Sequence, residues 1–411
     1  MATTEPMAPH HRRTVAVVIL STLLVLAVVT GSLVAIFYRH LDANLRAGDE
    51  IKHQTHKAQS GPKTPLNILV MGLDTRDCAG CHIDNEPGGD GSDTTILLHI
   101  SADRQTVYGI SIPRDLLVKP TDCTADHHYV VRGVDTGQVM WNAAYTAGGP
   151  DCTAEQLEKN FGVYVDGYIT INFGGFKGMV NAIGGVDVCI PFALRDTKYE
   201  KYTFEPGESV HLNGATALKY TRLRHTDDGA LDGSDTGRMK RQQYFISQMI
   251  SKLKSKGTLT EPYKLVGFAN ALTGSMTASP EFASVSKLVG LARQLRHTDI
   301  SNIRFITVPS VAYDVPRDDP RWGRVRLLPG AKRLWQHVIH DEPLSRSLRE
   351  GSISAGAPPA SGSPASSSGS ASGTASASAS ASASPGTTTR TSSESGSDDA
   401  AQEAERYGLC S

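Results

Sequence analysis

The sequence has almost no net charge. Its 41 lysines and arginines are balanced by 42 aspartates and glutamates, which leaves a formal charge of -1. Proteins that bind nucleic acid through their general charge are basic over a whole face, and no helix-turn-helix pattern occurs in this chain. The composition therefore argues against a nucleic-acid binder, and an anion site here has to be built from a local cluster of basic residues.

Aromatic and branched apolar residues are nearly absent between Ser352 and Ala400, where serine, alanine, glycine, proline and threonine dominate. Within this stretch, Ala375 to Ser384 is a strict alternation of alanine and serine. Such a segment cannot bury enough apolar surface to offset the entropy lost on ordering it. We predict that residues 350–411 are a disordered tail, which either crosses a cell wall or is a spacer with no function of its own.

Charged residues are missing from one long apolar run, Thr14 to Tyr38. As a helix it would span about 37 Å, enough to cross a hydrocarbon core of about 30 Å with some tilt. A cleaved signal peptide would have a shorter apolar run followed by an A-x-A site, and no clear site follows. We predict an uncleaved single-pass anchor at 14–38 in the cell membrane. Because a short tail precedes the span and a large domain follows it, residues 1–13 are expected in the cytoplasm and the domain outside.

Cysteines are few, but their even number permits disulfides in an oxidising compartment. The six are Cys78, Cys81, Cys123, Cys152, Cys189 and Cys410. Their connectivity cannot be deduced from spacing alone. The best single pair is Cys123 with Cys152, since both lie in polar, loop-like sequence that flanks a helix. Cys189 lies in an apolar stretch and can equally be a core residue.

The remaining sequence predicts one globular domain at 65–345, joined to the membrane by a polar stalk at 39–64. Runs of buried residues predict strands at 66–72, 94–101, 106–112, 164–173, 186–190 and 303–308. Helical periodicity predicts helices at 137–147, 153–161, 174–183, 214–219, 236–256, 280–295 and 330–340. Strands interleaved with helices indicate an α/β domain with a central, mixed β-sheet flanked by helices.

Two acidic motifs lie beside predicted strands. Asn67 to Arg76 is a buried strand that delivers Asp74 at its mouth, and Gly91 to Leu98 places Asp93 just before a second strand. Magnesium usually takes one or two carboxylates plus substrate phosphates. A lone acid at such a position is more often a cap or turn residue, but this pair beside an arginine cluster predicts a magnesium site made by Asp74 and Asp93.

Basic residues occur in two motifs that are far apart in the chain. Ser111 to Asp115 contains Arg114, and Tyr220 to Arg224 contains Arg222 and Arg224. If the second motif is a strand, its period of two places Tyr220, Arg222 and Arg224 on one face. Two arginines on one face repel each other unless an anion lies between them. We therefore predict a guanidinium clamp for a diphosphate, with a purely structural pairing to neighbouring aspartates as the alternative.

The structural alternative involves named aspartates near each basic motif. Arg114 can pair with Asp115 or Asp74, and the second motif can be neutralised by the acids that follow it, Asp227, Asp228 and Asp232.

Arg238 and Gln242 lie four residues apart in the first turns of a predicted helix. Their side chains share a face near the positive end of the helix dipole, which favours phosphate.

Two further motifs are typical of other cofactors. Cys78 to His82 has the C-x-x-C-H spacing of haem attachment, but its Gly/Asp-rich surroundings favour a local disulfide or two thiols. The pair His127 and His128, with Cys123 and Asp126, matches no usual zinc spacing, so we interpret it as a surface loop.

Seven motifs in order resemble the LytR-CpsA-Psr family and extend over about 66–256. They are NILVMGLDTR, GSDTTILL, GISIPRDLLV, WNAAYTAGG, GGFKGMVNAIGGVDVCI, LNGATALKYTRLR and DTGRMKRQQ. The resemblance implies a membrane-anchored extracytoplasmic enzyme that moves a glycopolymer from undecaprenyl diphosphate onto peptidoglycan. Many relatives have an arginine before the Ser-Asp-Thr unit, where this chain has Gly91. Position 91 therefore cannot supply the guanidinium that these relatives have there.

Carried over by motif, the resemblance implies that Asp74 and Asp93 hold Mg²⁺. It further implies diphosphate contacts from Arg114, Arg222, Arg224, Arg238 and Gln242. The predicted catalytic residues are Asp93, Arg114, Arg222 and Arg224, with Asp93 or a substrate phosphate oxygen activating the acceptor hydroxyl. Two alternatives use the same clamp: a non-catalytic protein that binds lipid-linked polymer, and a lipid pyrophosphatase that uses water as the acceptor. The polymer cannot be identified from the sequence, although its Ala- and Gly-rich composition suggests an actinobacterium.

Overall fold

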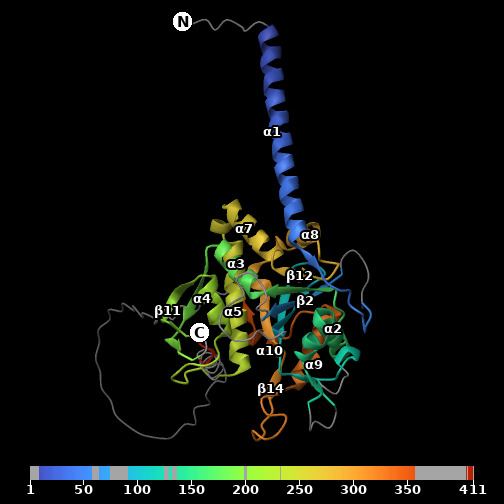
Figure 1. The fold of residues 1–411 in the computed structure, drawn as a ribbon, viewed down its shortest axis with the longest axis vertical. Coiled ribbons are helices and arrows are strands. Elements are labelled where there is room, and N and C mark those ends of the chain that lie inside the picture. Colours follow the sequence, from blue (N-terminus) through green and yellow to red (C-terminus); the bar gives the residue numbers. More distant parts are fainter. Residues whose placement is uncertain are drawn as a thin grey trace, which may run out of the picture.

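The computed structural model describes residues 9–57, 64–74, 91–124, 129–131, 137–198, 201–231, 233–356, 404 and 406–410. A long helix, α1 (Pro9–Asn44), projects from one end of an α/β domain (Figure 1). It is the one helix of the described residues that is long and apolar enough to cross a membrane, with a mean hydropathy of 2.6 in its most apolar window. The predictions for Cys78 to His82, for His127 and His128, and for 357–403 of the tail lie outside the described residues.

An eight-stranded mixed sheet forms the centre of the domain, as predicted. Its order is β1 (Arg46–Ala47), β12 (Met276–Ala278), β7 (Gly167–Asn172), β2 (Leu66–Leu73), β3 (Ser92–Ile100), β4 (Val107–Ile112), β13 (Ile303–Thr307) and β16 (Ile353–Ser354). The central strands β2, β3 and β4 are antiparallel, whereas β7 and β13 run parallel to their neighbours β2 and β4. Because the loops β2–β3 and β4–β5 open at the same end, the polar residues that follow or precede these strands are brought together there.

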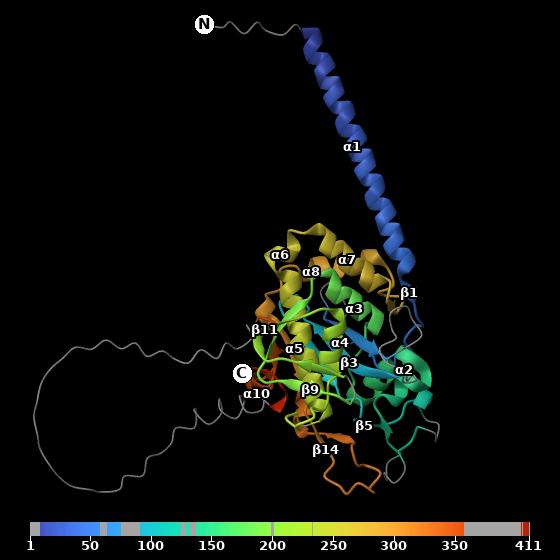
Figure 2. The same ribbon diagram turned by 60° about the vertical axis from the view of Figure 1, so that its left-hand side comes forward.

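Helices cover both faces of the sheet, and the alternation of side chains along each strand explains why. Leu69 and Met71 of β2 point to the face covered by α2 (Ala143–Phe161) and α9 (Pro329–His340). Ile68, one residue before Leu69, points to the opposite face, where α5 (Asp235–Lys254) and α8 (Val285–Leu295) pack. Figure 2 shows α5 and α2 on different sides of the central strands.

A second core lies beside the sheet, around α5. It is built from α3 (Phe173–Ala182), β8 (Val186–Ile190), β11 (Gly207–Leu212) and α4 (Gly214–Arg222), with the hairpin β9 (Leu194–Asp196) and β10 (Tyr202–Phe204). Tyr220 and Phe245 are fully buried in it. Asn213 begins α4 by accepting hydrogen bonds from the backbone N–H groups of Ala215 and Thr216.

Short elements complete the fold. They are β5 (Leu117–Val118), a 3-10 turn (Asp122–Thr124), β6 (Val139–Met140), α6 (Lys256–Leu259), α7 (Pro262–Thr273), a 3-10 turn (Ile300–Asn302), β14 (Ser310–Ala312), β15 (Val325–Leu327) and α10 (Arg346–Glu350).

Most predicted elements match the structure to within a few residues, but two do not. The helix predicted at 137–147 is wrong at its start, since Val139 and Met140 form β6 and α2 begins only at Ala143. From there α2 continues through 153–161, with a kink at Gly149 before Pro150. The strand considered for Tyr220 to Arg224 is also wrong, because α4 continues to Arg222.

The segments on either side of the domain pack against it. In the predicted stalk (39–64), β1 adds a strand beside β12, and Glu158 Oε2 accepts a 2.6 Å hydrogen bond from the backbone N–H of Gln54. At the other end of the chain, Leu409 is buried and Cys410 forms a disulfide with Cys189. Both ends of the predicted tail, residues 350–356 and 406–410, are therefore structured, and Cys189 is not merely a core residue.

Candidate functional site

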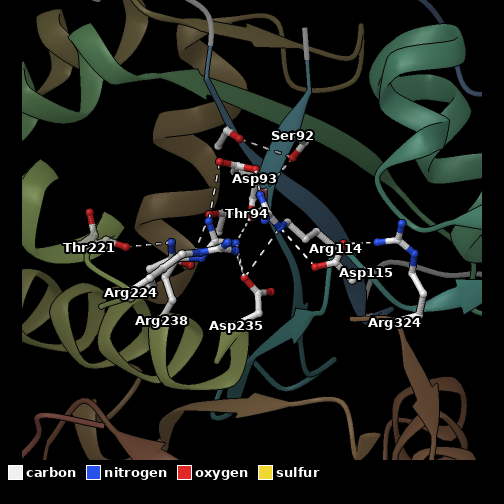
Figure 3. Close-up of polar contacts among 12 residues, drawn as sticks. Ser92, Asp93, Thr94, Arg114, Asp115, Thr221, Arg224, Asp235, Arg238 and Arg324 are labelled. Carbon is white, nitrogen blue, oxygen red and sulfur yellow. Dashed lines mark hydrogen bonds and ion pairs between the residues drawn. The ribbon is translucent and has the colours of Figure 1, made fainter. Parts of the chain in front are cut away.

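The site is built around Asp93, which lies at an irregularity in the sheet. Leu73 pairs with Ser92 and Gly72 pairs with Thr94, so that Asp93 is the extra residue of a β-bulge. A bulge turns its side chain out of the regular alternation. Ser92 fixes the bend by donating hydrogen bonds to the carbonyls of Gly72 and Thr94. The Asp93 carboxylate lies among the basic residues (Figure 3).

Arg114 approaches Asp93 from the end of the next strand. Pro113 ends β4, and the turn that follows is closed by a 3.2 Å hydrogen bond from the N–H of Leu116 to the Pro113 carbonyl. Arg114 Nη1 donates a 2.6 Å hydrogen bond to Asp93 Oδ1. Its Nε lies 3.4 Å from Asp115 Oδ2, so the structural pairing considered from sequence exists alongside the contact with Asp93.

The first turn of α5 supplies the second half of the site. Ser234 begins the helix by accepting a hydrogen bond from the N–H of Gly237. Asp235 lies in the positive end of the helix dipole, and Arg238 one turn later places Nη2 2.6 Å from Asp235 Oδ1. Arg238 is only 4 % exposed and also donates to the Asp93 carbonyl, at 3.1 Å. Arg238 thus connects α5 with the bulge of β3.

The remaining arginines come from the end of α4, in a helical rather than an extended arrangement. Tyr220 points into the core, while the Arg222 guanidinium lies 5.3 Å from the centre of the Phe173 ring. Arg224 follows the helix end and donates a 2.5 Å hydrogen bond to Asp235 Oδ1. The expectation that Tyr220 shares a face with the two arginines is therefore wrong, because helical spacing separates residues two apart.

A polar cavity of about 290 Å³ lies between these elements. It is lined by Asp93, Arg114, Asp196, Arg222, Arg224, His225 and Arg238. Four arginines and two aspartates line it, and with Asp235, which pairs with three of these arginines from outside the lining, one formal positive charge remains in excess. The structure thus brings together four of the five predicted diphosphate contacts, from segments that are far apart in the chain.

The charges of the lining shift its protonation equilibria. Burial by itself would raise the pKa of Asp93, but Arg238, Arg114 and Arg224 together hold it below its usual value. Burial would likewise lower the pKa of Arg114, and Asp93, Asp235 and Asp115 raise it above its usual value instead. Burial lowers the pKa of Arg238, against the effect of Asp235. Asp93 is therefore an anion at neutral pH, and the guanidiniums remain charged.

Gln242, the fifth predicted contact, lies one turn behind Arg238 and does not line the cavity. Its Nε2 donates a 3.1 Å hydrogen bond to the Thr221 carbonyl, and its Oε1 accepts one of 3.2 Å from the Thr94 hydroxyl. It therefore links the end of α4 to β3. The predicted contact between Gln242 and the diphosphate stays a prediction.

Asp74 and Asp93 lie at adjoining strand ends, as the magnesium prediction requires. Asp74 directly follows β2, and its N–H lies 3.4 Å from the carbonyl of Gly91, two residues before Asp93. Two carboxylates of this kind are the hard oxygen ligands that Mg²⁺ uses together with substrate phosphates. The low pKa of Asp93 keeps one of them ionised. The two carboxylates have the chemistry of magnesium ligands, and the magnesium site stays a prediction.

Sequence reasoning missed the residue that organises the cluster. Asp235 directly precedes the helix predicted at 236–256, and its Oδ1 is shared by Arg224, Arg238 and, at 3.7 Å, Arg114. Its position in a D-x-x-R pattern at a helix start was the available signal. Arg324, 3.5 Å from Asp115, was also missed, since it directly precedes β15, which is far from Asp115 in the sequence. Of the acids considered for this role, Asp227 pairs instead with Arg195, and Asp232 lies outside the described residues.

The chain is similar in sequence to a known family and to proteins of other bacteria. The model of the LytR_cpsA_psr family matches residues 36–319. The polyisoprenyl-teichoic acid–peptidoglycan teichoic acid transferase TagV of Bacillus subtilis is 32% identical over 208 residues, which are 49% of this chain and 47% of TagV. The cell wall biosynthesis protein LcpA of Corynebacterium glutamicum is 27% identical over 284 residues, 60% of this chain and 50% of LcpA. The chain thus spans about half the length of these relatives.

Solved structures agree on the fold. The crystal structure of B. subtilis TagV covers 69% of this chain and 100% of its own, with a TM-score of 0.51 at 23% identity. A LytR-Csp2A-Psr enzyme from Actinomyces oris covers 71% of this chain and 95% of its own, with a TM-score of 0.52 at 21% identity. These values confirm the α/β architecture predicted from the sequence.

Proposed function

Because the chain belongs to the LytR_cpsA_psr family, we propose that it transfers a glycopolymer from a polyprenyl diphosphate carrier, such as undecaprenyl diphosphate, to peptidoglycan. The observation that carries this proposal is the cavity with its four arginines and its excess of positive charge. A diphosphate is a compact anion that several guanidiniums can bind at once, each on different oxygens. The transferases named among the relatives support the choice of reaction.

The carboxylates prepare the cavity for an anion. Asp235 holds Arg224 and Arg238 in place before substrate arrives, so that the arginines need little rearrangement when charge develops on the diphosphate. During transfer, a sugar hydroxyl of peptidoglycan attacks the phosphorus next to the polymer. The bond from that phosphorus to the bridging oxygen breaks, and polyprenyl phosphate leaves with the electron pair while Arg114, Arg224 and Arg238 stabilise its charge.

The basicity of Asp93 is expected to change when the diphosphate binds. With Arg114 and Arg238 on its oxygens, its lowered pKa makes it a weak base. A bound diphosphate competes for the same guanidiniums, which weakens their effect on the pKa of Asp93 and frees a carboxylate oxygen to accept the proton of the sugar hydroxyl. Asp74 and Asp93 would hold Mg²⁺, and the metal when bound supplies positive charge to the phosphate oxygens.

The disulfides support an extracytoplasmic location. Cys123 pairs with Cys152, the pair predicted from the sequence, and Cys189 pairs with Cys410. Structural disulfides persist mainly in oxidising compartments. Together with the apolar helix α1, they support a protein anchored in the cell membrane by a single pass, with its N-terminus in the cytoplasm and its domain outside.

One assay tests the proposal against its two alternatives. The full-length protein in detergent or liposomes is incubated with a lipid-diphosphate-linked glycan, magnesium and peptidoglycan oligomers. Transfer predicts a glycan–peptidoglycan product together with polyprenyl monophosphate. Monophosphate without the conjugate would indicate a pyrophosphatase. Stable binding of the lipid-linked glycan with neither product would indicate a non-catalytic binding protein.

A further inference from the structure

A second arginine of α5, one turn after Arg238, points away from the cavity and is almost fully buried. Arg241 is 1 % exposed, and its guanidinium donates hydrogen bonds to two main-chain carbonyls. Nη2 donates to the Leu223 carbonyl, and Nη1 donates to the Tyr407 carbonyl at 2.8 Å. Arg241 therefore connects two segments that are separated by most of the second half of the chain.

The first of these carbonyls belongs to the cavity wall. Leu223 lies between Arg222 and Arg224, both of which line the cavity, and its side chain is fully buried. Its N–H is hydrogen-bonded to the Lys219 carbonyl at the end of α4. With the side chain packed and both backbone polar groups bonded, the peptide units that carry the two arginines have one defined orientation.

The second carbonyl belongs to residues 404 and 406–410, which we call the distal segment. Cys410 of this segment forms a disulfide with Cys189 of β8, and Leu409 is 7 % exposed in the second core. Gly408 has a φ of +67°, and a Cβ there would lie 3.1 Å from the Leu231 side chain and 3.3 Å from that of Leu194. Since β9 runs from Leu194 to the cavity residue Asp196, the distal segment also supports the opposite wall.

We propose that the distal segment is a positioning element of the diphosphate cavity, acting through Arg241. A buried guanidinium that loses one of its two carbonyl acceptors has to be solvated or has to find another partner. Arg241 would then move, and with it the Leu223 carbonyl and the arginines on either side. The disulfide keeps the segment in place because it ties Cys410 directly to Cys189 of β8. This inference rests on the proposed function of the cavity as a diphosphate site.

The test releases the segment without changing any cavity residue. A protease site is inserted into the Ala/Ser repeat at 375–384 of the full-length protein. After cleavage the distal segment is attached only through Cys189–Cys410, and a dithiol reductant converts that disulfide to two thiols as it closes to its own cyclic disulfide. Binding of inorganic pyrophosphate is measured by calorimetry in four states: uncut or cut, each oxidised or reduced.

The controls isolate the segment from other effects of reduction. Cys123–Cys152 is exposed to the reductant in both the uncut and the cut protein, so that its loss cancels in their comparison. We expect the cut and reduced protein to bind pyrophosphate at least tenfold more weakly than the uncut and reduced protein. We expect the cut but oxidised protein to bind like the uncut one. Equal binding in all four states would overturn the proposal, whereas no binding even by the uncut, oxidised protein would instead refute the diphosphate site itself.

The same samples allow a second measurement, of how tightly the released distal segment rebinds to the protein. If docking of the segment strengthens pyrophosphate binding by a given factor, pyrophosphate must strengthen docking by the same factor. The released segment should therefore rebind more tightly when pyrophosphate is present. Rebinding that is independent of pyrophosphate would contradict coupling between the two sites.

A variant pair tests Arg241 directly. Arg241→Met retains the aliphatic volume without donors, and Arg241→Lys retains the charge but can reach the two carbonyls only with a single ammonium. We expect the methionine variant to lose at least tenfold in pyrophosphate affinity of the folded protein, and the lysine variant to lose less. A purely structural role predicts a lower melting temperature with unchanged affinity of the folded fraction, and that result would overturn the role of Arg241.

Discussion

The Arg114 guanidinium is held 2.6 Å from the Asp93 carboxylate, across the ends of two antiparallel strands. The pair joins the first basic motif to the second acidic motif at the mouth of the cavity. Each member keeps the other charged: Arg114 contributes to the low pKa of Asp93, and Asp93 contributes to the high pKa of Arg114. An anion that enters the cavity therefore meets charges that are already ionised and oriented.

The first prediction concerns the pH dependence of stability. The folded pKa of Asp93 lies below the ordinary 3.8, so its contribution to stability is complete above 3.8 and is lost as the pH falls through the folded value. The difference in free energy of unfolding between the wild type and Asp93→Asn should be constant from neutral pH to about pH 5 and shrink in more acidic solution. Urea unfolding of both proteins at a series of pH values measures this difference in free energy. A difference that grows on acidification would show that Asp93 is not stabilised as an anion.

The second prediction concerns the cavity arginines. Arg222→Ala and Arg224→Ala should each reduce transfer at least about tenfold, since a hydrogen bond to a charged group contributes about 1.5–3 kcal/mol. Arg195→Ala is the matched control, because Arg195 directly precedes the cavity residue Asp196 and pairs with Asp227 but does not itself line the cavity. Transfer should be measured with the lipid-linked glycan, and folding checked by circular dichroism. Near-normal transfer by both cavity variants would refute the shared anion site.

The third prediction concerns the disulfide between Cys123 and Cys152. It joins the 3-10 turn between β5 and β6 to the part of α2 that follows the kink at Gly149, with a sequence separation of 29. Replacing both cysteines by serine should lower the free energy of unfolding by about 3–4 kcal/mol, from the loop entropy that the bond removes from the unfolded chain. Denaturant unfolding measures this cost.

The same double variant should leave the cavity intact. Neither cysteine contacts the arginines, so the folded protein should bind pyrophosphate with unchanged affinity. Weaker binding would mean that the start of α2 also determines the geometry of the cavity.

Local patterns in the sequence were sufficient for the elements that carry the site. The strand that precedes Asp74 and the helix that carries Arg238 are encoded by their own apolar periodicity, and the structure has them as β2 and α5. Such patterns do not reveal which side chains meet. The role of Asp235 depends on three arginines from three different segments, and only the folded chain brings them to one carboxylate oxygen.

Residue spacing alone was also insufficient to predict the helix at Tyr220 and the disulfide of Cys189. Tyr220 to Arg224 alternates like a strand, but Asn213 caps a helix seven residues earlier, and burial of Tyr220 in the second core favours that helix. Cys189 looked like a core residue because its neighbours are apolar. Its partner Cys410 is 221 residues away, beyond a segment of biased composition, so no local signal could identify the pair.

The last prediction concerns the metal, because it links Asp74 and Asp93. If both hold one magnesium ion, Asp74→Asn and Asp93→Asn should each weaken magnesium-dependent turnover, and the double variant should be little worse than the worse single variant. Residues that serve one ion act as a unit, so their effects do not add.

Calorimetry provides a readout that does not depend on turnover. Magnesium should strengthen pyrophosphate binding by the wild type, and each single variant should lose most of that gain. Some binding without metal should remain in both variants, since Arg222, Arg224 and Arg238 provide separate contacts. Fully additive losses of turnover would assign the two aspartates to different tasks. Undiminished turnover in excess chelator would remove magnesium from the reaction, and the arginines alone would then have to stabilise the charge that develops on the diphosphate.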